Sequence, residues 1–191
     1  ICAGCPHRGV FYILKKLGVF VSGDIGCYTL GAAAPLQAMD TTVCMGASIA
    51  MAHGFDKATD GAASANTVAI IGDSTFLHSG VTNLINAVYN QSRITVVILD
   101  NSITGMTGHQ QNPSTGLDIR LRPAPAICLE DLCRAVGVDS IRVVDPVDTS
   151  LCQKIIREEL EKDCVSVVIT RRPCALIPKG KGKKEDRTVV N

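Results

Sequence analysis

Apolar and polar positions along the chain follow two periods, one typical of helices and one typical of buried strands. Residues 7–18 carry apolar side chains at 10, 11, 13, 14 and 17, which is the spacing of one helix face, and Gly18 ends the run. Residues 67–72 and 94–100 are almost uniformly apolar, as strands are when both faces of a parallel sheet are covered. The pattern therefore predicts an α/β domain.

Strand and helix patterns alternate along the rest of the chain. Further strands are predicted at 19–24, 140–145 and 165–172, and further helices at 46–58, 80–91, 129–137 and 148–162. This alternation predicts a doubly wound, mostly parallel sheet with right-handed crossovers. Residues 101–127 are rich in Gly, Pro and Asn and exceed the usual loop length, which indicates a functional loop or contact with another chain.

The length of 191 residues suits one domain with a sizeable core, which we expect at 1–178, followed by a basic linker or tail at 179–191. Because the chain begins with Ile1 and ends in this tail, we expect it to be cut from a longer polypeptide. The net charge of +1 offers no electrostatic reason to expect nucleic acid or an anionic membrane as a partner. No apolar run approaches the ~20 residues that span a bilayer.

The chain contains nine cysteines, an unusually large and odd number. A core of the predicted size does not need disulfides to hold it together, so a secreted disulfide framework is disfavoured. Free thiols in the cytoplasm, some of them committed to a metal or a cluster, fit the composition better.

Two buried strands end in the same way, in a carboxylate. The stretch "VAIIGDSTFLHSG" (68–80) leaves its strand at Gly72–Asp73, and "ITVVILDNSITGMTG" (94–108) leaves its strand at Asp100–Asn101. If the strands are neighbours, their backbones lie ~4.8 Å apart and both carboxyl ends open on one edge, where such sheets bind ligands. Asp73 and Asn101 can then converge on a hard cation such as Mg²⁺, with diphosphate oxygens as further ligands and Gly72 allowing a phosphate to approach. Ordinary turn residues after strands are the alternative.

These endings resemble the thiamine diphosphate motif, GDG followed some two dozen residues later by NN, with Ser74 and Asp100 as departures from it. Both departures are similar to those of the 2-oxoacid:ferredoxin oxidoreductases, and in particular to the α subunits of indolepyruvate ferredoxin oxidoreductases. The resemblance covers the chain densely from 2 to 113 and resumes at 169–178. It rests on "CAGCPHRG", "SGDIGCYTLG", "CMGASIAMAHG", "GDSTFLHSG", "ILDNSITGMTGHQQNP" and "ITRRPCALIP".

The resemblance implies a thiamine diphosphate-binding fold and roles for particular residues. Asp73 and Asn101 would be Mg²⁺ ligands, and Ile103 would supply a backbone carbonyl. The stretch at Cys44, Met45 and Gly46 would lie against the rings of the cofactor, with Met45 as an apolar wedge; plain core packing is the alternative for Met45. The implied cofactor-binding residues also include Gly72, Ser74, Thr75 and Thr107. By its place after the Asp73 loop, His78 is a candidate for contact with diphosphate or substrate, with a structural role at the helix start as the alternative. His109, in the long loop, is a candidate for contact with substrate.

Four cysteines are expected at one edge of the sheet. Cys2 and Cys5 form a CxxC pair, while Cys27 and Cys174 each follow a predicted strand. Four thiolates are what a 4Fe–4S cluster needs, and the resemblance implies a cluster held in this way beside thiamine diphosphate. A structural Zn²⁺ or four unrelated thiols are the alternatives. The other five are expected to be small buried side chains: Cys44, Cys128, Cys133, Cys152 and Cys164.

The function implied by the resemblance is oxidative decarboxylation of an arylpyruvate such as indolepyruvate, with coenzyme A as acyl acceptor and ferredoxin as electron acceptor. No catalytic residue is assigned within the chain: the activating glutamate would come from a separate pyrimidine-binding domain, and a second subunit would complete the enzyme. None of Glu130, Glu158, Glu159, Glu161 and Glu185 is expected beside the cofactor edge. A non-redox thiamine decarboxylase or lyase and a non-catalytic diphosphate-binding module are the alternatives.

Overall fold

A computed structural model describes residues 1–177, in which six parallel strands form one sheet of order β2-β1-β3-β4-β6-β5. This confirms the predicted doubly wound sheet. The strands are β1 (Phe20–Gly23), β2 (Thr41–Thr42), β3 (Thr67–Gly72), β4 (Thr95–Asp100), β5 (Ser140–Val144) and β6 (Ser166–Arg171). The predicted tail at 179–191 lies outside the described residues.

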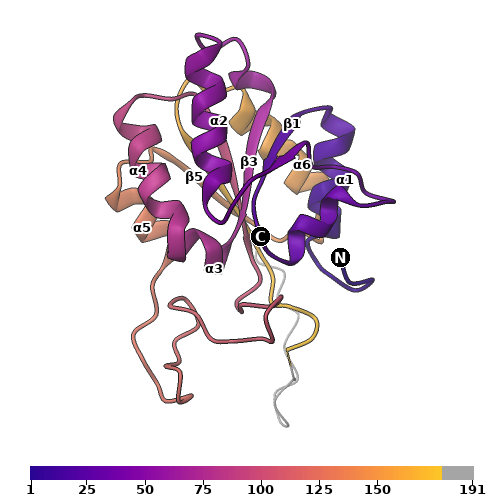
Figure 1. Cartoon of the computed structure of the whole chain (residues 1–191), viewed down its shortest axis with the longest axis vertical. Helices are drawn as coiled ribbons and strands as arrows, with labels where there is room; N and C mark the ends of the chain where they lie inside the picture. Colours follow the sequence, from indigo (N-terminus) through magenta and orange to yellow (C-terminus); the bar gives the residue numbers. More distant parts are fainter. Residues whose placement is uncertain (178–191) are drawn as a thin grey trace.

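Helices cover both faces of the sheet, with α1 and α6 together on one side and α2, α4 and α5 on the other (Figure 1). Among the described residues, no helix combines the length and the apolar character needed to cross a membrane. The α-helices are α1 (Arg8–Leu17), α2 (Ala47–Ala58), α3 (Asp73–Thr75), α4 (Val81–Tyr89), α5 (Leu129–Ala135) and α6 (Thr149–Leu160).

The core is split into two clusters by the alternation of side chains along the central strands. In β3, Val68 and Ile70 face α1 and α6, while Ala69 and Ile71 face α2 and α4. All four side chains are fully buried, and burying a side chain of the size of Ile or Val contributes roughly 1.5–3 kcal/mol. Burial on both faces explains why the strand sequences are almost uniformly apolar.

The sequence pattern missed four local features. The edge strand β2 is too short to leave a pattern, and Cys27–Ala32 and Ser64–Asn66 form 3₁₀ helices η1 and η2. The helix predicted at 80–91 is the end of a longer helical path, because α3 begins directly at Asp73 and continues through a π-helical turn, η3 (Phe76–Gly80), into α4. Irregular π turns of this kind are frequent at functional sites.

Residues 101–127 form the long predicted loop, which extends past the carboxyl end of the sheet (Figure 1). The isolated bridges Thr104–Gln110 and Leu117–Pro123 give it its local order. Several of its apolar side chains face solvent, most completely Ile119, which is 96% exposed. The loop therefore lies over the edge at which the predicted site residues meet.

Candidate functional site

The ends of β3 and β4 lie side by side, as the sequence predicted. The two strands pair in parallel with Gly72 opposite Leu99, so Asp73 and Asp100 follow at the same level of neighbouring strands. Asn101 comes one residue later, at the same carboxyl edge. The predicted β-α-β unit therefore brings both strand endings together.

Asp73 is a buried carboxylate at the start of α3, with 2% of its surface exposed. Burial, and then repulsion from Asp100, raises the pKa of Asp73 to about 7, while hydrogen bonds from the Ser74 backbone and the Asn112 side chain act in the opposite direction. Within residues 1–177, no lysine, arginine or histidine forms an ion pair with Asp73. A buried carboxylate without a cationic side chain fits a metal ion as its counter-charge.

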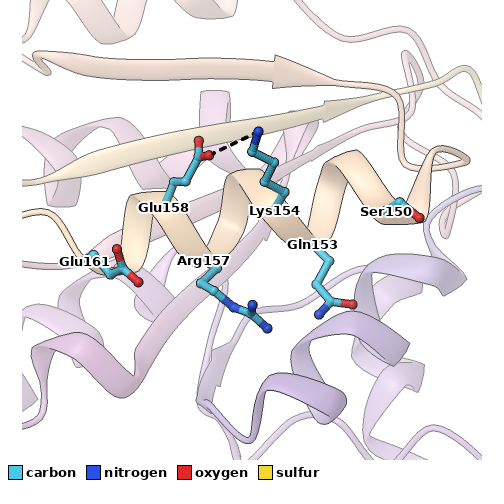
Figure 2. Close-up of a pocket in the computed structure, with 6 residues that line it drawn as sticks. All are labelled: Ser150, Gln153, Lys154, Arg157, Glu158 and Glu161. Carbon is cyan, nitrogen blue, oxygen red and sulfur yellow. Dashed lines mark ion pairs between the residues drawn. The ribbon is translucent and has the colours of Figure 1, made fainter.

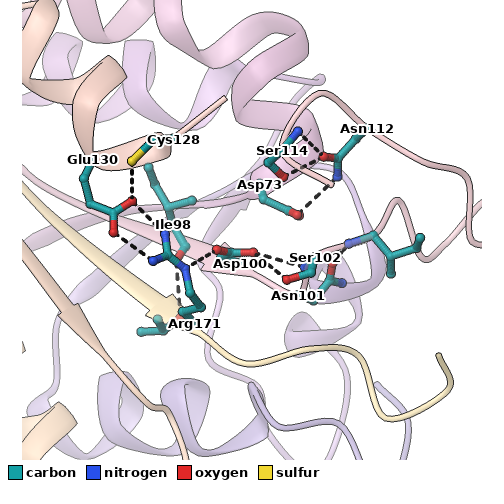
Figure 3. Close-up of polar contacts among 12 residues, drawn as sticks. Asp73, Ile98, Asp100, Asn101, Ser102, Asn112, Ser114, Cys128, Glu130 and Arg171 are labelled. Atoms are coloured by element: carbon teal, nitrogen blue, oxygen red, sulfur yellow. Dashed lines mark hydrogen bonds and ion pairs between the residues drawn. The ribbon is translucent and has the colours of Figure 1, made fainter. Parts of the chain in front are cut away.

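Asn112, from the long loop, holds this carboxylate in place. Its Nδ2 donates to Oδ2 of Asp73 over 3.2 Å, and its Oδ1 accepts from the backbone N and the Oγ of Ser114 over 2.9 and 2.7 Å (Figure 3). Asn112 is only 7% exposed. Sequence reasoning missed this residue; its only signal was an amide in an otherwise exposed Gly/Pro-rich stretch. The loop is thus tied directly to the end of β3.

Asn101 and Ile103 form a tight turn after β4. Oδ1 of Asn101 accepts from the backbone N of Ile103 over 3.1 Å, and the Ile103 side chain is buried. The backbone carbonyl of Asn101 accepts from the N–H of Cys174 over 2.9 Å, which fixes the turn against the segment after β6. A carboxylate, an amide oxygen and backbone carbonyls at one edge are the donors that Mg²⁺ prefers, so the residues present fit the implied metal.

Asp24, a residue that sequence reasoning missed, fixes the backbone at the start of α2. Its carboxylate accepts from the backbone N–H groups of Gly46 and Ser48 over 2.7 and 3.0 Å. Gly46 has φ +86°, and a Cβ there would lie 2.7 Å from the Ser79 backbone oxygen, so only glycine fits without strain. Met45 is 47% exposed, which excludes the alternative of plain core packing within the described chain.

The predicted phosphate contacts have local partners. Gly72 is required by the ring of Tyr28, because a Cβ at residue 72 would lie 2.7 Å from that ring; this gives Gly72 a packing role in addition to the predicted one. The hydroxyl of Thr75 donates to the Ile25 carbonyl over 3.0 Å, and Ser74 Oγ lies 2.7 Å from Thr104 Oγ1.

Thr107 and the two candidate histidines lie in more exposed positions. Thr107 Oγ1 donates to Gln110 Oε1 over 2.5 Å within the loop. His78 belongs to the π-helical turn. His109 Nε2 lies 3.9 Å from the Cys174 thiol, which brings the long loop to the segment after β6.

The four predicted cluster cysteines are close enough to affect one another. Burial, and then repulsion from Cys174, Cys2 and Cys27, raises the pKa of the Cys5 thiol, partly offset by the backbone N–H of His7. Burial followed by Cys2 and Cys174 also raises the pKa of Cys27. All nine cysteines of the chain are free thiols.

These four thiols are neighbours without forming a finished ligand shell. In the described part of the chain, no three His, Cys, Asp or Glu side chains converge closely enough to hold a metal ion. The donor type fits an iron–sulfur cluster or zinc, whereas the geometry shows four thiols still apart.

The expectation that the other five cysteines are buried is wrong for three of them. Cys133 and Cys152 are buried, but Cys44 and Cys128 are exposed and Cys164 is half-buried. The two exposed thiols lie just before helices α2 and α5, where the side chain of a residue before the first turn points into solvent.

The expectation that no glutamate lies beside the edge is wrong for Glu130. This residue is in the first turn of α5, which starts at the carboxyl edge, and its two oxygens accept from the Arg171 guanidinium over 2.8 Å each (Figure 3). Hydrogen bonding to Arg171 lowers the pKa of Glu130 to about 2. Because both oxygens are committed to Arg171, Glu130 is not a candidate for activating a cofactor.

Two shallow hollows lie on the surface, and they differ in their relation to this edge. One, of about 420 Å³, is lined by solvent-facing side chains of α6, among them Lys154 and Glu158 in a 3.8 Å ion pair (Figure 2). Its lining contains none of the predicted site residues. The other, of about 440 Å³, is formed by the long loop and includes His109 and Asn112. Only the second belongs to the candidate site.

Comparison with family models matches residues 24–170 to the C-terminal TPP binding domain of thiamine pyrophosphate enzymes. Subunit IorA of indolepyruvate oxidoreductase from Pyrococcus horikoshii is 43% identical over 201 residues, covering 98% of this chain. The corresponding subunit from Archaeoglobus fulgidus is 41% identical and covers 100% of this chain. The chain spans 31% of the length of each of these two relatives.

Solved structures share the fold at low sequence identity. The 2-oxoglutarate:ferredoxin oxidoreductase from Magnetococcus marinus, determined with 2-oxoglutarate, coenzyme A and succinyl-CoA bound, matches with a TM-score of 0.76, 18% identity and coverage of 94% of this chain and 65% of that one. Benzoylformate decarboxylase from Polynucleobacter necessarius matches with a TM-score of 0.66, 12% identity and coverage of 90% of this chain and 34% of that one.

Proposed function

From the premise that this chain belongs to the thiamine pyrophosphate enzymes, as their C-terminal TPP binding domain, we propose that it binds the diphosphate of thiamine diphosphate through Mg²⁺. We propose further that it does so within an indolepyruvate:ferredoxin oxidoreductase. The observation that carries the proposal is the buried carboxylate of Asp73 at the carboxyl edge, which pairs with no cationic side chain within residues 1–177. The similarity to IorA subunits supports the choice of reaction.

In this proposal, Asp73, Asn101 and the backbone carbonyl of Ile103 hold Mg²⁺. Strand pairing supports the first two, because it puts both at the same edge. The metal would bring together a buried negative charge and the anionic diphosphate, which otherwise repel each other. Asn112 keeps the carboxylate of Asp73 oriented by its 3.2 Å hydrogen bond.

The remaining predicted contacts surround this metal. Cys44, Met45 and Gly46 precede α2, where the exposed Met45 side chain is available to an organic ring. Ser74 and Thr75 lie in the first turn after β3, where backbone N–H groups favour a phosphate. Gly72 and Thr107 complete the proposed contacts, Thr107 from the loop.

Cys2, Cys5, Cys27 and Cys174 are proposed to hold a 4Fe–4S cluster. The mutual electrostatic effects of these thiols support their proximity. Thiolates are the ligands that such clusters use. Zn²⁺ at the same thiols is the second candidate, because zinc also binds four thiolates. Within the described residues the thiols do not converge, so either metal would have to draw the four together.

The overall reaction converts a 2-oxoacid anion, coenzyme A and two oxidised ferredoxins into acyl-CoA, CO₂, two reduced ferredoxins and one proton. Bound thiamine diphosphate supplies the electron sink for decarboxylation. This chain binds and orients the diphosphate end, and its loop 101–127 covers the edge. A pyrimidine-binding domain with its glutamate and a second subunit are the proposed partners. The cytoplasm is the proposed compartment, because all nine thiols are free.

The test is dye reduction by the complete assembly that contains this chain. With indolepyruvate, coenzyme A, Mg²⁺ and thiamine diphosphate, it should reduce a viologen, and omission of thiamine diphosphate should abolish the activity. Reduction at the same rate with the cofactor stripped would contradict the proposal. Decarboxylation to the aldehyde without dye reduction would favour the non-redox alternative.

A further inference from the structure

Two acidic side chains lie at neighbouring strand ends in this site, and among the described residues only Asp100 is paired with a cationic side chain, that of Arg171. Asp73 and Asp100 are 2% and 5% exposed, and the strand register sets them at the same level. Two negative charges at this edge disfavour the approach of an anionic diphosphate. The charge of the second carboxylate therefore has to be neutralised by a partner.

Arg171 at the end of β6 takes up the charge of Asp100. Its Nε donates to Oδ2 of Asp100 over 2.6 Å, and β4–β6 pairing places the two residues directly opposite each other. The other oxygen of Asp100 accepts from the backbone N and the Oγ of Ser102 over 3.1 and 3.3 Å. Both carboxylate oxygens of Asp100 therefore have hydrogen-bond donors, Oδ2 from Arg171 on β6 and Oδ1 from Ser102 in the turn after β4 (Figure 3).

Glu130 fixes Arg171 in that position. Its two oxygens receive the Nη1 and Nη2 groups over 2.8 Å each, while the Nε remains for Asp100. A guanidinium gripped in this two-pronged way has a defined orientation, which a lysine in the same place would lack. The Asp73 carboxylate instead turns toward Asn112 in the loop (Figure 3). The two aspartates are thus held by different partners.

We propose that Arg171, anchored by Glu130, is a positioning residue that neutralises Asp100 and keeps it off the metal, so that Asp73 is the single carboxylate ligand. This inference rests on the proposed function, because it concerns the same Mg²⁺ site. It accounts for how two buried aspartates can lie at neighbouring strand ends beside a single metal ion. It also assigns α5 a role in the site through Glu130.

The test is calorimetric titration of the complete assembly with Mg²⁺ alone and with thiamine diphosphate in the presence of Mg²⁺. In Arg171→Gln, the freed Asp100 should weaken thiamine diphosphate about tenfold, whereas Mg²⁺ alone should bind at least as tightly as in the wild type. Adding Asp100→Asn to that variant should restore the cofactor affinity to within about threefold. Arg172→Gln, which removes the neighbouring arginine and its exposed ion pair with Asp145, should change neither.

A merely structural Arg171 predicts a different result. If it only ties β4, β6 and α5 together, Asp100→Asn will not rescue Arg171→Gln, and the proposal is overturned. Asp100→Asn alone keeps the test decisive even if Arg171→Gln fails to fold: it should bind the cofactor within about threefold of wild type. A loss as large as that from Asp73→Ala would make Asp100 a ligand and overturn the proposal. Failure of the wild type itself to bind would instead overturn the proposed function.

Discussion

The two candidate sites at the carboxyl edge differ in how far their ligands are assembled. Asp73 lies on a rigid strand end, is buried, and is oriented by Asn112. The thiols of the CxxC pair, of Cys27 and of Cys174 come from three separate segments and are exposed or half-buried. Within the described residues they do not converge on one point. Strand pairing thus positions the oxygen ligands at one edge before any metal binds. The thiols on connecting segments instead need their metal to bring them together.

The largest effect expected from this contrast is at the thiols. Because the four thiols come from three separate segments, loss of one should prevent assembly altogether. Anaerobic reconstitution of the complete assembly should load about four irons at this site in the wild type, and Cys174→Ser should abolish this loading as completely as Cys5→Ser does. Iron analysis and the visible absorption spectrum measure the outcome.

Cys128→Ser is the matched control, because Cys128 is an exposed thiol that lies outside the proposed set. It should leave the iron content unchanged. A full cluster in Cys174→Ser would show that Cys174 is not a ligand. The contrast between the two sites would then fail.

The next effect is the loss of folding stability caused by burying the ionised Asp73 carboxylate without a metal. Its pKa of about 7 is above the ~3.9 of an unfolded aspartate, so the folded chain holds the proton more tightly, and stability is lost as pH rises from about 4 through 7. Without metal, Asp73→Asn should therefore be more stable than wild type by about 4 kcal/mol at pH 8, with no difference at pH 4. Denaturant unfolding in a chelator measures this.

Asp145→Asn supplies the comparison at another strand end, where the carboxylate is half-exposed and paired with Arg172. Its stability should change by less than about 1 kcal/mol at either pH. Equal pH profiles for wild type and Asp73→Asn would show that Asp73 carries no strain in the metal-free state.

The smallest effect is expected from the residue that orients Asp73. Asn112→Ala removes the hydrogen bond to the carboxylate and the link to the loop, which should weaken Mg²⁺–thiamine diphosphate binding about tenfold, or about 1.4 kcal/mol. Protease cleavage in 101–127 should also accelerate in this variant. Asn90→Ala, on the exposed end of α4, should change neither measurement. Unchanged affinity in Asn112→Ala would make the contact incidental.

The strands and the edge could be predicted from the sequence because burial on both faces leaves a strong apolar signal. The pairing of the β3 and β4 ends followed from the general geometry of parallel sheets, and the register Gly72–Leu99 confirms it. Sheet geometry says nothing about long-range polar contacts. Asn112 and Glu130 reach the site from a loop and from α5, and no local pattern marks them.

The local errors have similar physical causes. The π turn at Phe76–Gly80 and the two-residue β2 depend on packing against neighbours and leave no period in the sequence. Cys44 and Cys128 are exposed because each lies just before the first turn of a helix, and the sequence does not locate those helix starts closely enough to predict it. The roles of the site residues remain predictions that the substitutions above test.

The central claim is that Asp73 holds the metal that binds the diphosphate, and one measurement tests it most directly. Thiamine diphosphate is titrated calorimetrically with Mg²⁺ into the wild-type assembly, Asp73→Ala and Asp145→Ala. Asp73→Ala should weaken binding by at least about a hundredfold, or about 2.7 kcal/mol, while Asp145→Ala should match wild type. Wild-type affinity in Asp73→Ala would contradict the claim.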